Sequence, residues 1–187
     1  MSRVEATIML PLSVEDLTVR SRAVVRATVR QQQSSWDEGH RRIYTLTELA
    51  VSEVIHGEAP ATILVRTMGG EVDGIGMKVS GTTRLMPNQD VVLFLRNDPG
   101  DTSGFMVVGM SQGFYRVERD TAGRTMAVPG MEGVAFVRNG REGPLVDHST
   151  DAVRMPYDQF RARVRTAATT PVPTPIAPEP QPKRGSR

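Results

Sequence analysis

The chain has 187 residues, enough for one ordinary domain with a substantial core and a short extension. Its 23 basic and 21 acidic side chains give a formal net charge of +2, which provides no electrostatic reason to expect a nucleic-acid partner. The sequence contains no cysteine, which excludes disulfides, thiolate metal ligands and cysteine catalysis. We therefore expect a globular domain without a small-molecule cofactor.

Residues 1–12 are predicted to be an N-terminal extension, and they lack the apolar core of a signal peptide. The segment Val4-Glu5-Ala6 nevertheless has small residues where a signal-peptidase site requires them. A lost or mis-started signal sequence is one interpretation of this segment, and chance is the other. No apolar run approaches the roughly 18 residues of a membrane-spanning helix, so no transmembrane segment is expected.

Residues 13–16, SVED, form a capping-box-like pattern in which the serine hydroxyl accepts a free N–H of the first helical turn. The pattern predicts a short helix that places Val14 and Leu17 on one face. From residue 23 to residue 30 apolar and polar side chains alternate, as in a half-buried strand. The polar residues 31–42 are expected to form a connection.

Residues 43–55, IYTLTELAVSEVI, form a long β-rich run whose apolar phase shifts along its length. Such shifts predict bulges in one bent strand, as small closed barrels require. Residues 62–68 and 91–96 predict two further strands, and the second is apolar on both faces, which indicates a central position. Two more strands are expected within residues 105–120 and a weaker one near residues 125–128.

A C-terminal helix is expected at residues 155–168, where Pro156 suits the first helical turn. One face of this helix is apolar and would pack on the barrel, while the basic face points mostly to solvent. A helix that binds a partner or a membrane surface is the alternative. The apolar face comprises Tyr157, Phe160, Val164 and Ala167, and the basic face comprises Arg161, Arg163 and Arg165.

The domain is therefore expected to span residues 13–167. It is followed by a disordered proline-rich tail over residues 168–187, which has too little apolar surface to fold. Within the domain, Asn139-Gly140 predicts one further hairpin.

Residues 109–113, GMSQG, fit the spacing G-x-S-x-G of a serine-hydrolase nucleophile elbow. An elbow needs a strand before the serine and a helix after it, whereas the residues after Gly113 alternate as in a strand. The histidine that follows Ser111 in the sequence is His148, and its neighbour Asp147 is poorly placed to orient it as a triad requires. We therefore predict a bend at a barrel corner, and catalysis by Ser111 and His148 is the alternative.

Residues 68–81 are rich in glycine but match neither a phosphate loop nor a dinucleotide fingerprint. The carboxylates of Glu71 and Asp73 would also repel phosphate. A long flexible connection is expected here, with a binding loop for a protein partner as the alternative. The three histidines lack the spacing of a metal site, so no metal is expected.

Trp36 is the only tryptophan, and it lies in a polar segment where it either plugs a barrel end or anchors a partner. The candidate partner-binding residues are Trp36, Asp37 and Glu38, together with Glu71 and Asp73 of the 69–76 loop. A basic groove for single-stranded nucleic acid is an alternative, although interspersed acidic residues argue against it. Its candidate residues are Arg26, Arg30, Arg41 and Arg42.

Three stretches, SRAVVRATV, IYTLTELAVSEVIHG and PNQDVVLFL, resemble the netrin-like barrel proteins, which include relatives of the tissue inhibitors of metalloproteinases and bacterial counterparts. The stretches SSWDEGHRRIYT, MGGEVDGIG and VVGMSQGFYRV are similar to an uncharacterised group of small exported bacterial proteins. The resemblance covers roughly residues 13–165. It implies a five-stranded OB-type barrel with a flanking helix, export from the cytoplasm and no enzymatic activity. Metalloproteinase inhibitors ligate their target's metal through an N-terminal cysteine, which this chain lacks, so no inhibitory residue is carried over.

The sequence thus predicts a mainly β fold, a small OB-type (netrin-like) antiparallel barrel with a short N-terminal helix and a C-terminal flanking helix. The predicted function is that of a non-enzymatic extracytoplasmic module, periplasmic or secreted, which binds a protein or envelope partner through its loops. A serine hydrolase and an OB-fold binder of single-stranded nucleic acid are the alternatives.

Overall fold

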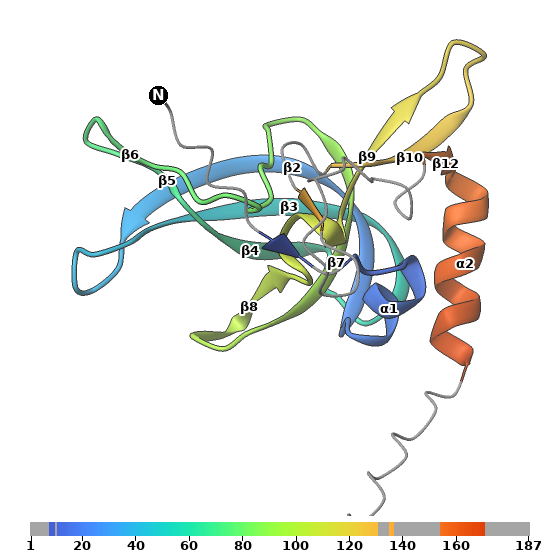
Figure 1. Cartoon of the computed structure of the whole chain (residues 1–187), viewed down its shortest axis with the longest axis horizontal. Coiled ribbons are helices and arrows are strands. Elements are labelled where there is room, and N and C mark those ends of the chain that lie inside the picture. Colours follow the sequence, from blue (N-terminus) through green and yellow to red (C-terminus); the bar gives the residue numbers. More distant parts are fainter. Residues whose placement is uncertain (1–7, 10, 131–134, 137–153, 171–187) are drawn as a thin grey trace, which may run out of the picture.

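The computed structural model describes residues 8–9, 11–130, 135–136 and 154–170 of the chain. Within these residues the protein is mainly β, with a short helix at each end (Figure 1). The helices are α1 (Val14–Val19) and α2 (Tyr157–Thr169), and a short 3-10 turn, η1, covers Met110–Gly113. The strands are β1 (Ile8–Met9), β2 (Ala23–Trp36), β3 (Ile43–Gly57), β4 (Thr62–Met68), β5 (Gly70–Val72), β6 (Ile75–Met77), β7 (Asp90–Asp98), β8 (Asp101–Val107), β9 (Phe114–Arg119), β10 (Thr125–Pro129), β11 (Ala135–Phe136) and β12 (Met155–Pro156).

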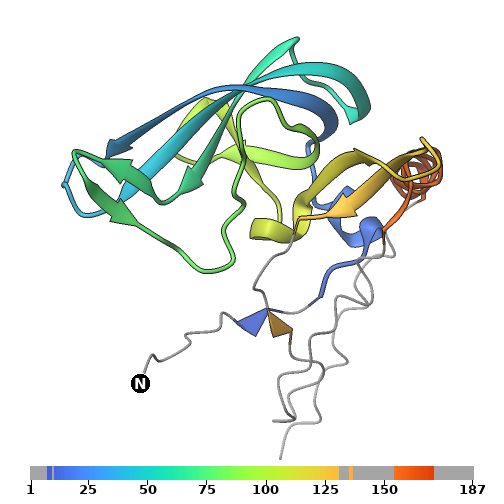
Figure 2. The same cartoon turned by 90° about the horizontal axis from the view of Figure 1, so that it is seen from above.

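The largest sheet curls back on itself. Its strand order is β12-β10-β9-β7-β2-β3-β4-β8, and β7 also pairs with β8, so β2, β3, β4, β8 and β7 close partly into a ring (Figure 2). Neighbouring strands are antiparallel except β4 and β8, which are parallel and meet at the pair Val65–Phe105. The hairpin of β9 and β10 continues outward from β7. The mainly β architecture with a helix at either end is therefore confirmed.

The ladder between β2 and β3 is irregular. Its register shifts at places that lie between Val24 and Val25, between Arg26 and Ala27, and between Val29 and Gln31. Extra residues in one strand bend it and increase its twist, and a sheet needs that curvature to close on itself. The bulges predicted from the shifting apolar phase of residues 43–55 are confirmed.

β7 is central because it is covered on both faces. Its inward-facing residues, such as Leu93, pack in a cluster inside the ring with apolar residues of β2, β3, β4 and β8. Its outward-facing Phe94 lies in a second cluster with both helices and contacts the Phe160 ring at a centroid distance of 5.9 Å. A strand with two buried faces cannot alternate in polarity, which is why residues 91–96 are apolar throughout.

Both helices have the predicted signals. At the start of α1 the Ser13 hydroxyl accepts the Asp16 N–H at 3.0 Å, and an Asp16 carboxylate oxygen accepts the Ser13 N–H at 3.1 Å. Val14 and Leu17 are buried as predicted. α2 begins directly after Pro156, buries its predicted apolar face and ends at Thr169, past the boundary expected at residue 167.

The prediction for residues 31–42 was wrong in part. β2 runs on to Trp36, and the chain from Asp37 to Arg42 is the turn into β3. Residues 31–36 carry no apolar alternation because polar cross-strand pairs replace it. The Gln32 amide donates to the Thr47 hydroxyl at 3.0 Å, and the hydroxyls of Ser34 and Thr45 lie 2.9 Å apart.

Within residues 68–81, where a long flexible connection was expected, β5 and β6 form a short hairpin. Asp73 and Gly74 both have positive φ, 51° and 78°, as a tight two-residue hairpin turn requires. The Asp-Gly pair was a sequence signal for this turn. The surrounding glycines favour a loop interpretation of the sequence and mask this signal.

The remaining predicted strands are present at residues 62–68, in β8 and β9, and in β10. From the expected extension 1–12, β1 pairs in parallel with β11. The hairpin predicted at Asn139-Gly140 and residues 171–187 of the predicted tail lie outside the described residues.

Candidate binding surface

The turn between β2 and β3 places Trp36, Asp37 and Glu38 at one end of the molecule. Trp36 ends β2 and stacks on the His40 ring, with centroids 6.0 Å apart and an interplanar angle of 17°. Asp37 closes the turn: its Oδ1 accepts the N–H groups of Arg41 at 2.7 Å and Arg42 at 3.2 Å. These bonds, the one from Arg41 first, hold the pKa of the Asp37 carboxyl below its usual range.

Asp37 is therefore committed to holding the turn, whereas Glu38 is exposed. A partner that reaches this turn would meet the Glu38 carboxylate, the edge of the Trp36 ring and the stacked His40. Trp36 is half-buried, which fits an aromatic group that is fixed in place and still reachable.

The hairpin of β5 and β6, whose residues include Glu71 and Asp73, lies at the same end as the β2–β3 turn (Figures 1 and 2). The chain turns back at Gly69 and Gly70, whose φ angles of 97° and 136° lie in the region that favours glycine. Gly70 lies so close to the sheet that a Cβ there would come within 2.5 Å of the Ser34 hydroxyl oxygen. The hairpin consequently crosses the outer half of β2, with Glu71, Asp73 and Ile75 exposed.

All the residues predicted to bind a partner thus lie at one end of the molecule, although the two segments are more than 30 residues apart in the sequence. This surface, which we call the loop end, comprises Trp36, the 37–42 turn and the β5–β6 hairpin. Its charge is mixed, because Arg41, Arg42 and Lys78 are exposed near Glu38, Glu71 and Asp73.

The GMSQG segment forms the junction between β8 and β9. Gly109 and Met110 have φ angles of 63° and 58°, and η1 leads directly into β9 rather than into a long helix. Ser111 is 2% exposed, its N–H donates to the Gly81 carbonyl at 3.0 Å, and its hydroxyl has no hydrogen-bond partner among the described residues. His148, its proposed base, lies outside the described residues. A buried hydroxyl on a strand-to-strand turn lacks the exposure that a nucleophile elbow provides.

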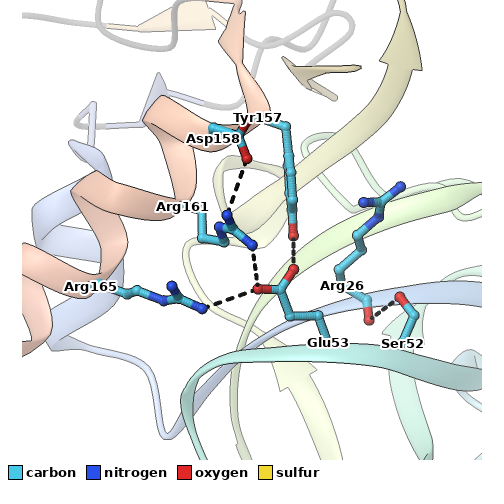
Figure 3. A network of polar contacts seen from close by, with 7 residues as sticks. All are labelled: Arg26, Ser52, Glu53, Tyr157, Asp158, Arg161 and Arg165. Carbon is cyan, nitrogen blue, oxygen red and sulfur yellow. Dashed lines mark hydrogen bonds and ion pairs between the residues drawn. The ribbon is translucent and has the colours of Figure 1, made fainter. Parts of the chain in front are cut away.

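The basic face of α2 is not simply solvated as predicted. Glu53 on β3 accepts hydrogen bonds from the Tyr157 hydroxyl at 2.7 Å, from Arg161 at 3.3 Å and from Arg165 at 3.2 Å (Figure 3). Arg163 forms a bidentate pair with Glu15 of α1, at 2.9 and 2.8 Å. Burial first, and then the hydrogen bond to Glu53, raise the pKa of Tyr157, so this hydroxyl keeps its proton. The network clamps α2 to the sheet and to α1.

The four arginines proposed for a nucleic-acid groove do not gather on one surface. Arg26 forms a bidentate pair with Asp90, in which Nη2 and Oδ2 are 2.6 Å apart, and its guanidinium lies 4.8 Å from the centroid of the Tyr157 ring. Asp90 raises the pKa of Arg26 further. Arg30, Arg41 and Arg42 are exposed elsewhere. An arginine held by a carboxylate beneath a helix is poorly available to phosphate.

Sequence reasoning missed a cluster on the outer face of β3 and β4. The Arg66 guanidinium lies 4.9 Å from the centroid of the Tyr44 ring and pairs with the buried carboxylate of Asp98. Asp98 also accepts the N–H of Gly100 at 2.8 Å. The alternation in residues 62–68 places Arg66 outward, but its partner Asp98 is the last residue of β7, and nothing in the sequence connects the two positions.

Among the described residues, no group of three or more His, Asp or Glu side chains is arranged to hold a metal ion. The helices within the described ranges are too short or too polar to cross a membrane. No protein-family model matches the chain, and no curated protein matches its sequence. The resemblance to netrin-like proteins and to small exported bacterial proteins therefore stays a prediction.

Proposed function

We propose that the chain is a non-enzymatic binding module that holds a protein or envelope partner at the loop end. The observation that carries this proposal is the placement of the half-buried Trp36 and the exposed Glu38, Glu71 and Asp73 at one end of the molecule. The rigid sheet positions two short turns there, an arrangement that proteins commonly use for recognition. An extracytoplasmic location rests on the sequence resemblance and is part of the proposal.

We further propose that the ring is an OB-type barrel. The first three strands of the ring, β2, β3 and β4, follow one another in the sheet, and β8 then lies between β4 and β7. A five-stranded, partly open ring with such a crossover supports an OB assignment. OB folds bind ligands through loops at the barrel mouth, and the β2–β3 turn occupies the place of the first of those loops.

The serine-hydrolase alternative is weaker, because Ser111 is buried and η1 is followed by the strand β9, whereas a nucleophile elbow is followed by a helix. The nucleic-acid alternative is also weaker, because Arg26 is bound to Asp90 and the exposed cations are interspersed with carboxylates. No specific observation favours either over a protein-binding surface.

The test begins with capture of partners from the native envelope fraction, followed by identification through mass spectrometry and titration with the purified partner. Trp36 is the sole tryptophan, so its emission reports binding at the loop end without a label. The double variant Glu71→Lys/Asp73→Lys should weaken binding at least about tenfold, which corresponds to roughly 1.4 kcal/mol.

The matched control is Glu58→Lys/Glu118→Lys, which makes the same charge change at exposed positions away from the loop end. It should bind like the wild type. Equal loss in both double variants would mean that net charge and not the loop end governs binding, and it would refute the proposed surface.

A further inference from the structure

The outer half of β2 has an open edge. β7 pairs with β2 as far as Thr28, and Val29 exchanges hydrogen bonds with Gln89 and Asn88, each at 2.9 Å. Beyond that point, β3 pairs with residues 31–36 on one side and no described strand pairs with them on the other. The open edge is thus the side of β2 from Gln31 to Trp36 that faces away from β3.

The hydrogen-bond pattern shows which backbone groups face this edge. The Asp37 N–H donates to the Arg42 carbonyl at 2.8 Å, so the backbone groups of Asp37 face β3. Because these groups alternate in direction along a strand, residues 31, 33 and 35 also face β3. The N–H and C=O groups of Gln32, Ser34 and Trp36 therefore face the open edge.

This edge lacks two of the features that commonly protect edge strands, although the Gln32 side chain on one face of β2 donates to the Leu85 carbonyl at 3.2 Å. Neither a charged residue nor a proline occurs from Gln31 to Trp36. Two of the large exposed apolar side chains belong to segments that approach this half of β2, Ile75 on the hairpin at 56% exposure and Met86 in the turn beside Val29 at 47%. The hairpin crosses the face of β2 that carries the Ser34 side chain and leaves the edge itself without a described strand.

We propose that an extended segment of the partner polypeptide adds to β2 as an antiparallel strand on the open edge. This inference rests on the proposed function and specifies how the partner binds. The free N–H and C=O groups along the edge can form hydrogen bonds with the backbone of another extended peptide. In this mode of binding the main-chain hydrogen bonds supply affinity, and the flanking side chains supply selectivity.

The charged residues Arg30 and Glu38 mark the two ends of the partner segment. Arg30 lies at one end of the open edge, and Glu38 lies at the other, where exposed carboxylates and the cations Arg41, Arg42 and Lys78 are interspersed. An antiparallel segment would therefore carry a basic residue where it begins, beside Glu38, and an acidic residue where it ends, beside Arg30. A segment that pairs with all three of Gln32, Ser34 and Trp36 is long enough to reach from Glu38 to Arg30.

The probe is the nonapeptide Lys-Thr-Val-Thr-Ser-Thr-Val-Thr-Glu, whose central serine would lie opposite Ser34. Amide hydrogen exchange of the full chain is measured by NMR with and without the peptide. With peptide at about ten times its Kd, exchange at Gln32, Ser34 and Trp36 should slow about tenfold. The amides of residues 31, 33 and 35, which already bond to β3, should change little.

Two modified peptides serve as controls. N-methylation of the third and seventh peptide residues removes N–H groups that face β2 and should abolish protection. N-methylation of the fourth and sixth residues, which face away, should leave it. Equal binding of the two modified peptides, or unchanged exchange at all the edge amides with millimolar peptide, would overturn strand addition.

On the protein side, Ser34→Pro removes one edge N–H at a position where an edge strand tolerates proline. Ser34→Ala keeps that N–H and removes the hydroxyl that contacts Thr45. The proline variant should bind the peptide more than tenfold more weakly, and the alanine variant should bind normally. If Ser34→Pro fails to fold, as a melting curve would show, the methylated peptides still decide the question.

A remaining outcome is protection of the same amides on raising the protein's own concentration without peptide. That result would assign the edge to a second copy of the chain and would overturn the partner segment. If the purified partner binds the loop end while the edge amides stay unprotected, the strand addition fails and the proposed function stands.

Discussion

The Tyr157 hydroxyl donates a 2.7 Å hydrogen bond to Glu53, which joins the first turn of α2 to β3. These residues are 104 positions apart in the sequence, and the bond is the shortest contact in the network that clamps α2 to the sheet (Figure 3). Tyr157→Phe should therefore lower the free energy of unfolding by about 1 kcal/mol, the usual net contribution of one hydrogen bond. Thermal or urea unfolding measures the change.

A double-mutant cycle with Glu53→Ala isolates the pair. The two changes should be non-additive by roughly 0.5 kcal/mol or more, because each removes the same contact. Additive effects would mean that the hydroxyl contributes nothing through Glu53. Glu15→Gln, which weakens the more exposed pair with Arg163, should lower stability less, by about 0.5 kcal/mol.

The corner at η1 depends on its glycines and not on Ser111. A Cβ at Gly113 would lie 2.4 Å from the Val108 carbonyl oxygen, so Gly113→Val should lower stability by more than roughly 2 kcal/mol. Ser111→Ala should change stability by at most about 1 kcal/mol, because its buried hydroxyl has no partner among the described residues. Melting temperatures and ester hydrolysis are measured on both variants.

Gly76→Val is the matched control, since a Cβ at Gly76 meets nothing within 4 Å. It should change stability by less than about 0.5 kcal/mol. Hydrolysis that disappears with Ser111→Ala while the fold persists would contradict the corner interpretation and restore the hydrolase.

The Asp37 carboxylate should make the loop end sensitive to acid. Its folded-state pKa lies below the unfolded value of about 3.9, because it accepts the Arg41 and Arg42 N–H groups. The stabilisation is therefore fully present above that unfolded pKa and is lost as pH falls through the lower folded pKa. Trp36 emission between pH 5 and pH 2 should show a step that Asp37→Asn removes.

Asp120 is the control, because it holds the β9–β10 turn in the same way and its pKa is also lowered, mainly by the Arg124 N–H. Asp120→Asn should leave the emission step unchanged. A step that survives Asp37→Asn would show that another group governs the turn.

Arg66 should matter for stability because Asp98 is buried. Arg66→Met leaves the Asp98 carboxylate, whose side chain is 1% exposed, with the Gly100 N–H as its described partner. The expected loss is about 2 kcal/mol, since a buried charge that loses its partner retains its desolvation penalty. Urea unfolding of Arg66→Met and of Arg66→Met/Asp98→Asn provides the measurement.

The double variant should recover part of this loss, because the neutral amide is less costly to bury than an unpaired carboxylate. A double variant that is no more stable than Arg66→Met would contradict the role assigned to the ion pair.

Features that depend on neighbours in the sequence were predictable. The capping box at Ser13, the apolar face of α2 and the doubly apolar β7 each follow from a local period or a local hydrogen bond. The shifting phase of residues 43–55 predicted bulges for the same reason, because a side chain's direction is set within its own strand. Among the predicted partner-binding residues, Glu38, Glu71 and Asp73 are exposed, and their role in binding stays a prediction.

Tertiary structure decided what depends on residues far apart in the chain. The polar residues 31–36 extend β2 because β3 pairs with them and satisfies the backbone groups of residues 31, 33 and 35, which no apolar alternation could signal. The arginines of α2 are ion-paired because Glu53 and Glu15 come from distant elements, and the loop end exists because the chain turns back at Gly69 and Gly70. The sequence by itself determined the elements and their buried faces, since these depend on local geometry. Only the folded chain decided which edges stay open and which charges meet, because those depend on how strands pair across the ring.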